Sequence, residues 1–132
     1  ENGFQFVCEI SDSPLFVNGD RDALAQIVVN LLSNAEKYSG ATKEILLRAE
    51  LVSPFVEVKI CDRGPGVPVG FEEKVFDQFF RAHDSLGSGV QGSGLGLTLA
   101  RQIARAHSGD VTYAKRDGGG CCFTLKIPKA TS

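Results

Sequence analysis

A narrow polar stripe runs along one predicted helix, and its residue types are unusual for a helix surface. Gln26, Asn30 and Asn34 are spaced by four residues, and Lys37 follows three later. At about 100° per residue, these side chains fall within an arc of roughly 80°. Asparagine is unfavourable in the interior of a helix. The alternative interpretation is an ordinary solvated face, but such a face would more often use Glu and Lys. Neutral amide oxygens suit a hard cation that stays bound to phosphates and water, as Mg²⁺ does.

A first glycine loop, residues 62–66 (Asp-Arg-Gly-Pro-Gly), directly follows a predicted strand. Gly64 and Gly66 bracket a proline, so the turn is stiff and a flat ring can approach its backbone closely. The Asp62 carboxylate can accept a hydrogen bond from an exocyclic amine, which is the donor that distinguishes adenine. The alternative is a simple turn in which Asp62 caps its own backbone. This loop alone leaves both interpretations open.

A second glycine segment, residues 87–97, contains two glycine patterns, of which only the second indicates a binding site. Residues 87–92 match GxGxxG, but no strand precedes them, so a dinucleotide fingerprint is excluded. No Walker loop occurs. Gly92, Gly94 and Gly96 instead alternate directly into a predicted helix, where free N–H groups favour phosphate. A flexible loop is the alternative, and the backbone entropy that each glycine loses argues against it.

These residues need a scaffold, and the sequence predicts one domain over residues 1–132. Alternation and turn signals predict strands at 4–10, 15–18, 45–52, 55–61, 110–115 and 121–127. Helices are predicted at 21–38 with Asp20 as N-cap, at 72–80, and from about 94 to 108. This order implies a two-layer α/β sandwich, with a mixed, mostly antiparallel sheet of about five strands and three helices on one face.

The apolar arc of the last predicted helix is expected to face the sheet; it comprises Leu95, Leu99, Ala100, Ile103 and Ala104. Arg101 and Arg105 are placed on the far side. Four cysteines, Cys8, Cys61, Cys121 and Cys122, form no CxxC pair. Cys8, Cys61 and one of the two adjacent cysteines are interpreted as buried small hydrophobes in a reducing, cytosolic setting.

Composition excludes several classes of protein. The chain is 42% hydrophobic and 23% charged, with a net charge of −2 and scattered basic residues. We therefore expect no nucleic-acid partner and no direct membrane contact. No transmembrane span or signal peptide is predicted.

Four segments, taken together, resemble the ATP-binding catalytic domain of two-component sensor histidine kinases, within the superfamily shared with DNA gyrase, mismatch-repair ATPases and heat-shock chaperone ATPases. Residues 30–39 (Asn-Leu-Leu-Ser-Asn-Ala-Glu-Lys-Tyr-Ser) resemble the N box, and 62–66 the first glycine box. Residues 76–81 (Phe-Asp-Gln-Phe-Phe-Arg) resemble the F box, and 92–97 the second glycine box. The resemblance covers essentially the whole chain and implies a Bergerat-type ATP-binding fold.

The resemblance implies a role for each matching residue, with Mg²⁺ and ATP as cofactors. Asn34 would bind Mg²⁺, with Asn30 sharing the task, and Lys37 would contact phosphate beside Tyr38. Asp62 would hold the adenine amine. The remaining nucleotide-binding residues would be Gly64, Gly66, Gly92, Gly94, Leu95 and Gly96, and Arg81 would reach the γ-phosphate.

One position favours the kinases over the hydrolases of the superfamily. Gyrase-like ATPases carry a glutamate one turn before the metal asparagine, where this chain has Asn30. An amide is a poor general base, so hydrolysis should be weak and the phosphoryl group is kept for a protein acceptor. Arg81 in the F box favours the same branch. Ser108 departs from the family pattern, in which glycine is usual.

The acceptor histidine of this family lies in a separate dimerisation domain, and neither His83 nor His107 is in such a setting. The resemblance therefore implies a catalytic half whose partners are that domain and, indirectly, a response regulator. It also implies a monomeric isolated domain, a homodimeric parent and a cytoplasmic location, with a parent that can be anchored in the inner membrane. Three alternatives are an ATPase or serine-kinase module, a non-catalytic nucleotide sensor and a DNA-binding module.

Overall fold

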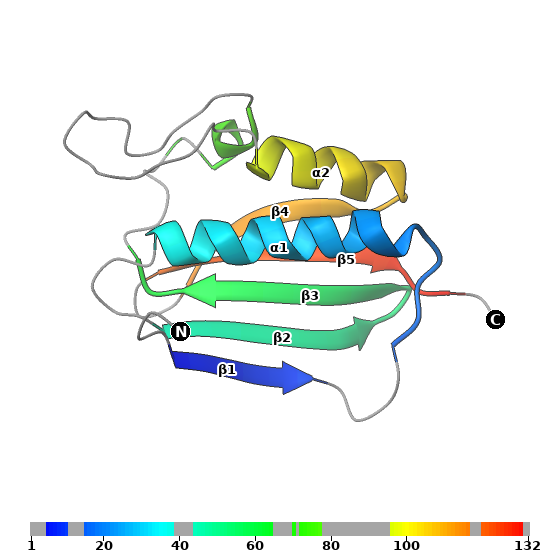
Figure 1. The fold of residues 1–132 in the computed structure, drawn as a ribbon, viewed down its shortest axis with the longest axis horizontal. Coiled ribbons are helices and arrows are strands. Elements are labelled where there is room, and N and C mark those ends of the chain that lie inside the picture. The colour runs from blue at the N-terminus through cyan, green and yellow to red at the C-terminus, as the bar shows by residue number, and fades with distance from the viewer. Residues whose placement is uncertain are drawn as a thin grey trace.

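The computed structural model describes residues 5–10, 15–38, 44–64, 70, 72–77, 96–116 and 120–130, apart from the side chains of residues 5, 6, 37 and 38. Its elements are β1 (Gln5–Ile10), α1 (Arg21–Tyr38), β2 (Glu44–Val52), β3 (Phe55–Asp62), a 3-10 turn η1 (Lys74–Phe76), α2 (Gly96–Ala106), β4 (Asp110–Lys115) and β5 (Cys121–Pro128). Figure 1 shows α1 and α2 lying side by side over one face of a single sheet. The predicted two-layer sandwich is confirmed.

The sheet is mixed, as predicted, with strand order β1-β2-β3-β5-β4. β1 pairs with β2 in parallel, and the other neighbours are antiparallel. The strands predicted at 45–52 and 55–61 form as β2 and β3, and Ser53 and Pro54 join them in an antiparallel hairpin. The short strand predicted at 15–18 is wrong, because that segment makes only an isolated bridge between Val17 and Lys129. Phe16 there is 69% exposed, so little apolar surface holds the segment to the sheet.

The first helix forms because a capping side chain and a continuous apolar side act together. Asp20 caps α1, its Oδ1 accepting hydrogen bonds from the backbone N–H groups of Asp22 at 2.9 Å and Ala23 at 3.2 Å. Ile27, Leu31 and Ala35, spaced by four, are buried against the sheet. Full burial of a side chain such as Ile27 contributes roughly 1.5–3 kcal/mol to stability.

The helix predicted at 72–80 is wrong in type and length. Only the 3-10 turn η1 forms, and Asp77 after it has extended backbone angles (φ −72°, ψ 146°). The adjacent side chains of Val75 and Phe76 are both buried. Residues 78–80 lie outside the described part of the chain. The described part of the chain thus contains two α-helices and one 3-10 turn where three helices were expected.

The orientation predicted for α2 is wrong at two residues. Leu99 is 43% exposed, whereas the Arg101 side chain is only 12% exposed. The buried side of α2 is centred on Ala100 and Ala104, which allow close approach to its neighbours. Around the helix, Arg101 is about 60° from Ala104 and Leu99 about 140°. Arg101 therefore lies at the edge of the buried face, and Leu99 points away from it.

The C-terminal end of α2 is joined to the start of α1. His107 Nε2 accepts a hydrogen bond from the Asp20 backbone N–H at 3.2 Å, and its Nδ1 lies 2.9 Å from the Ile103 carbonyl oxygen. His107 therefore has a structural role in joining α2 to α1. Ser108, where glycine is usual, has a positive φ of 66°, and the Gly109 N–H bonds the Ala104 carbonyl at 2.8 Å. This is a left-handed helix ending.

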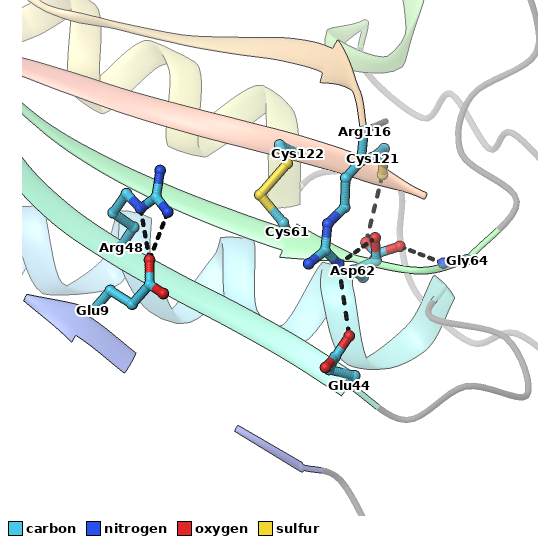
Figure 2. Close-up of a disulfide and its surroundings, with 9 residues drawn as sticks. All are labelled: Glu9, Glu44, Arg48, Cys61, Asp62, Gly64, Arg116, Cys121 and Cys122. Atoms are coloured by element: carbon cyan, nitrogen blue, oxygen red, sulfur yellow. Dashed lines mark hydrogen bonds and ion pairs between the residues drawn. A yellow bond between two sulfur atoms is a disulfide. The ribbon is translucent and has the colours of Figure 1, made fainter. Parts of the chain in front are cut away.

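The cysteines are only partly as predicted. Cys61, Cys121 and Cys122 are buried, but Cys8 is exposed. Cys61 and Cys122, which face each other across β3 and β5, form a disulfide (Figure 2). The interpretation of Cys61 as an unlinked small hydrophobe is therefore wrong. Sequence alone does not give the register of two strands 61 residues apart, and that register creates the pair.

Among the helices that the structure describes, none is long and apolar enough to cross a membrane.

Candidate functional site

Three elements carry the candidate residues. In Figure 1, the C-terminal ends of α1 and β3 lie on the left, and α2 begins above the middle part of α1. They carry Asn34, Asp62 and Gly96, which belong to three of the four segments singled out in the sequence. A hydrogen bond between Asn30 and Gly96 joins two of these segments, which are 66 positions apart along the chain.

Asp62 is the one buried polar or charged residue of the described chain, with 1% of its surface exposed. Its Oδ1 accepts a hydrogen bond from the Gly64 backbone N–H at 2.7 Å, and its Oδ2 accepts one from the Cys121 thiol at 3.5 Å. The bond to Gly64 is the self-capping turn considered above as the alternative. A turn does not require burial of the carboxylate, however, so capping alone does not account for Asp62.

Burial raises the pKa of Asp62 above its ordinary value, because desolvation disfavours the charged form. The hydrogen bonds from Gly64 and Cys121 and the positive charge of Arg116 act in the opposite direction without cancelling that effect. A carboxylate kept in a partly unfavourable state is a common mark of a binding site. A ligand that donates a hydrogen bond to Asp62 would relieve part of this desolvation.

Two residues beside Asp62 were missed by the sequence analysis. Cys121 pairs with Asp62 in the β3–β5 ladder, so both side chains point to the helix-covered face. Burial, followed by the charge of Asp62, raises the pKa of the Cys121 thiol to about 12, so the thiol stays protonated and can donate. A side chain at Gly120 would collide with the Asp62 carbonyl, so glycine permits this close approach. Only the strand register could have revealed either residue.

Charged residues surround the same strand end (Figure 2). Glu44 Oε1 accepts a hydrogen bond from Arg63 Nε at 2.6 Å and lies 4.0 Å from Arg116 Nη1. Arg116 Nη1 also lies 3.4 Å from the Asp62 carbonyl oxygen. These contacts join β2, β3 and the residue after β4, and they fix the backbone on which the Asp62 carboxylate depends.

The polar stripe of α1 is held by its own hydrogen bonds. Gln26 Nε2 donates to Asn30 Oδ1 at 2.7 Å, and Asn30 Nδ2 donates to the Gly96 carbonyl oxygen at 3.2 Å. Asn30 therefore links the middle of α1 to the first residue of α2. A side chain at Gly96 would meet nothing within 4 Å, so there is open space beside that helix start.

The donor set decides how a Mg²⁺ ion could be held. Asn34 is half-buried, and the amide oxygen of Asn30 is already hydrogen-bonded to Gln26. Within the described ranges, no group of three His, Cys, Asp or Glu side chains could hold a metal by itself. The residues fit an ion that takes one amide oxygen from the protein and most of its ligands from phosphates and water.

Several predicted site residues cannot be located. The backbone of Lys37 and Tyr38 forms the last turn of α1, but their side chains lie outside the description. Five further predicted site residues lie entirely outside the described part of the chain, namely Gly66, Arg81, Gly92, Gly94 and Leu95. Their roles remain predictions.

A two-layer sandwich that buries a carboxylate at a strand end can accept a hydrogen bond from a nucleotide base, and the family to which the chain is matched agrees with such a site. The family described as "Histidine kinase-, DNA gyrase B-, and HSP90-like ATPase" matches residues 19–131. The chain belongs to this family.

Its relatives are sensor kinases. The chain is 38% identical over 121 residues to the sensor protein KdpD of Escherichia coli, covering 92% of this chain and 12% of that protein. It is 34% identical over 130 residues to the sensor histidine kinase WalK of Bacillus subtilis, covering 97% of this chain and 21% of WalK. This chain is accordingly a catalytic ATP-binding domain of the sensor histidine kinase type, and it spans a small part of those two relatives.

Solved structures agree. The mycobacterial sensor histidine kinase MprB superposes with a TM-score of 0.82 at 30% identity, covering 94% of this chain and 84% of that chain. Full-length ShkA in complex with AMPPNP gives 0.80 at 28% identity, covering 98% of this chain and 26% of that chain. AMPPNP is the nucleotide named in that second structure.

Proposed function

We propose that this domain binds Mg-ATP and donates the γ-phosphoryl group to a histidine on a separate dimerisation domain of the same parent protein. The observation that carries the proposal is the buried Asp62 carboxylate at the C-terminal end of β3. Asn34 near the C-terminal end of α1 and Gly96 at the start of α2 are the candidate residues for the phosphate end. One acceptor for an adenine amine and one helix start for phosphate are thereby both present. The membership of the family supports ATP as the ligand.

At the base end, Asp62 accepts the adenine amine while Gly64 and Gly66 leave room for the ring. At the phosphate end, Asn34 is the proposed Mg²⁺ ligand. Lys37 contacts phosphate, Tyr38 packs near the nucleotide and Arg81 reaches the γ-phosphate. The remaining phosphate-binding residues are Gly92, Gly94, Leu95 and Gly96. When bound, Mg²⁺ supplies charge neutralisation on the phosphates.

The residues of the chain favour transfer over hydrolysis. Phosphoryl transfer depends mainly on positioning and on neutralising charge, so the domain need not supply a strong base. Asn30, which stands where the hydrolases have glutamate, cannot take a proton from water. Its amide is instead fixed between Gln26 and the Gly96 carbonyl oxygen. A neutral acceptor imidazole is already nucleophilic.

The partners follow from the same proposal. The dimerisation domain of the parent supplies the acceptor histidine, and a response regulator receives the phosphoryl group afterwards in two-component signalling. We place the domain in the cytoplasm, where ATP is available, as a monomer when isolated and within a homodimeric parent.

The test is transfer from radiolabelled ATP to a separately supplied dimerisation domain. We expect label on that domain that is lost in acid and retained in alkali, as phosphohistidine is. Label that survives acid would indicate a serine kinase of the same superfamily, and release of inorganic phosphate without label would indicate an ATPase. Either result would contradict the proposal.

A further inference from the structure

Arg101 on α2 joins three elements near the nucleotide-binding end of the fold. Its Nη1 lies 2.9 Å from Glu73 Oε1, next to η1, and its Nε lies 3.0 Å from Asp110 Oδ1 at the start of β4. Its guanidinium carbon lies 4.0 Å from the centre of the Phe76 ring. Only 12% of the Arg101 side chain is exposed, whereas the side chains of Asp110 and Glu73 are 25% and 75% exposed, so the contact with Asp110 is better shielded from water than the one with Glu73.

The electrostatics of this cluster favour its charged form. Burial alone would lower the pKa of Arg101, but hydrogen bonds with Glu73 and Asp110 hold it above its ordinary value. Burial alone would raise the pKa of Asp110, but hydrogen bonds from Arg101, Arg105 and the Val111 N–H hold it below its ordinary value. Opposite charges therefore stabilise each other here.

Thr98, one turn before Arg101, makes a second connection to the same turn. Its Oγ1 donates to the Phe76 carbonyl oxygen at 2.8 Å, in a partly buried position. The Phe76 ring also packs edge-on against Phe123 of β5, with centroids 5.9 Å apart. The turn η1 is consequently fixed by α2 through both its backbone and its aromatic ring.

These contacts fix two points on the chain relative to each other. Asp77 leaves η1 with extended backbone, and Gly96 begins α2, where its carbonyl oxygen also accepts the hydrogen bond from Asn30. Arg81 follows Asp77 by four residues in the sequence. None of the contacts of Arg101 or Thr98 involves Asp62.

We propose that Arg101 and Thr98 are positioning residues for phosphoryl transfer, which hold η1 on α2 and thereby set where the chain leaves Asp77 toward Arg81. This inference rests on the proposed function. The two residues act through the F-box turn and leave the adenine-binding end untouched. Their loss should therefore lower the rate of transfer and leave nucleotide affinity nearly unchanged.

The experiment compares Arg101→Met and Thr98→Val with the wild type, using ATP calorimetry and transfer to the dimerisation domain at saturating ATP. Methionine keeps much of the apolar volume of arginine, and valine keeps the shape of threonine. We expect both variants to bind ATP within about threefold of the wild type, with a transfer rate constant reduced roughly ten- to hundredfold, because small misplacement of reacting groups has effects of this size. Thr98→Ser, which keeps the hydroxyl, should restore transfer.

Arg105→Met is the matched control. Arg105 lies one turn further along α2, is 58% exposed and shares Asp110 with Arg101, but the described contacts of its side chain do not reach η1. Its transfer rate should equal that of the wild type. Unchanged transfer in Thr98→Val would overturn the inference, as would a fall in ATP affinity that matches the fall in rate. Should Arg101→Met fail to fold, Thr98→Val and its serine rescue still decide. If the wild type itself transfers nothing, the proposed function fails first and this inference with it.

Discussion

The two ends of the proposed nucleotide site are built in different ways. The adenine end consists of Asp62 and its partners Gly64 and Cys121, which lie on or directly after paired strands of the sheet. The phosphate end consists of helix faces, with half-buried Asn30 and Asn34 on α1 beside exposed Gly96 on α2. The sheet register holds the first end, whereas one side-chain hydrogen bond within α1 and one from α1 to α2 hold the second.

The difference teaches where specificity and chemistry reside. A carboxylate at 1% exposure with two fixed donors can discriminate a base, because a ligand that fails to pair with it leaves a buried acceptor unsatisfied. A half-buried amide stripe is more accessible to ions and water, which suits a site that must admit Mg²⁺ and release ADP. Changes at the adenine end should therefore alter affinity, and changes at the phosphate end should alter metal dependence and rate.

The largest expected effect is on Asp62. Asp62→Ala should reduce ATP affinity about ten- to hundredfold, because a buried hydrogen bond to a charged group is worth roughly 1.5–3 kcal/mol. Titration calorimetry measures the change. Asp62→Asn keeps the shape of the side chain and one acceptor oxygen, so its ATP affinity should lie between those of Asp62→Ala and the wild type. Equal ATP affinity in Asp62→Ala and wild type would refute the assignment of the adenine end.

The second prediction separates the two asparagines of α1. Mg²⁺ should increase the ATP affinity of the wild type, and Asn34→Ala should lose most of this increase. The loss should be about tenfold, because one protein ligand of the ion is removed. Asn30→Ala should keep more of that gain, because the Asn30 amide oxygen is bound by Gln26 at 2.7 Å. The measurement is ATP affinity with Mg²⁺ and with EDTA for both variants. The same loss in both would show that the asparagines share the ion equally.

The third prediction concerns hydrolysis at the phosphate end. Asn30→Glu should raise the slow ATPase turnover several-fold, because a carboxylate can accept a proton from water and an amide cannot. Asn30→Gln, which has the same length and no basic group, is the control. Phosphate release under multiple turnover gives the rates. Equal rates in the two variants would leave the general-base argument without support.

The smallest effect is the pH dependence of the adenine end. The pKa of Asp62 is raised by burial, so the carboxyl group takes up a proton at a higher pH than an ordinary aspartate would. As pH falls, the ionised acceptor is lost and ATP affinity should fall with it. Asp62→Asn does not titrate, and its affinity should follow only the titration of the nucleotide. Parallel pH profiles for the two proteins would contradict this role of Asp62.

Local signals in the sequence predicted the local parts of the fold. Asp20 caps α1 as expected, since an N-cap depends on residues two and three positions away. The two hairpin strands around Pro54 were also predictable from alternation. In the site, Asp62 could be singled out because a carboxylate at the end of a predicted strand, followed by a glycine loop, is a pattern that the sequence itself contains.

The remaining features depend on register and on tertiary contacts. Cys121 lies opposite Asp62, and Cys61 opposite Cys122, only because β3 and β5 pair in one particular register. Arg101 was placed on the solvent side because helical periodicity treats a charge as exposed. In the structure, Glu73 and Asp110 surround it with opposite charge, so a position at the edge of the buried face becomes favourable.

The most direct test of the central claim is calorimetric titration of the domain with ATP, with and without Mg²⁺. We expect saturable one-to-one binding in both conditions, because the adenine end needs no metal, and tighter binding with Mg²⁺, because the phosphate end does. Absence of binding in both conditions would contradict the claim that this chain is an ATP-binding domain.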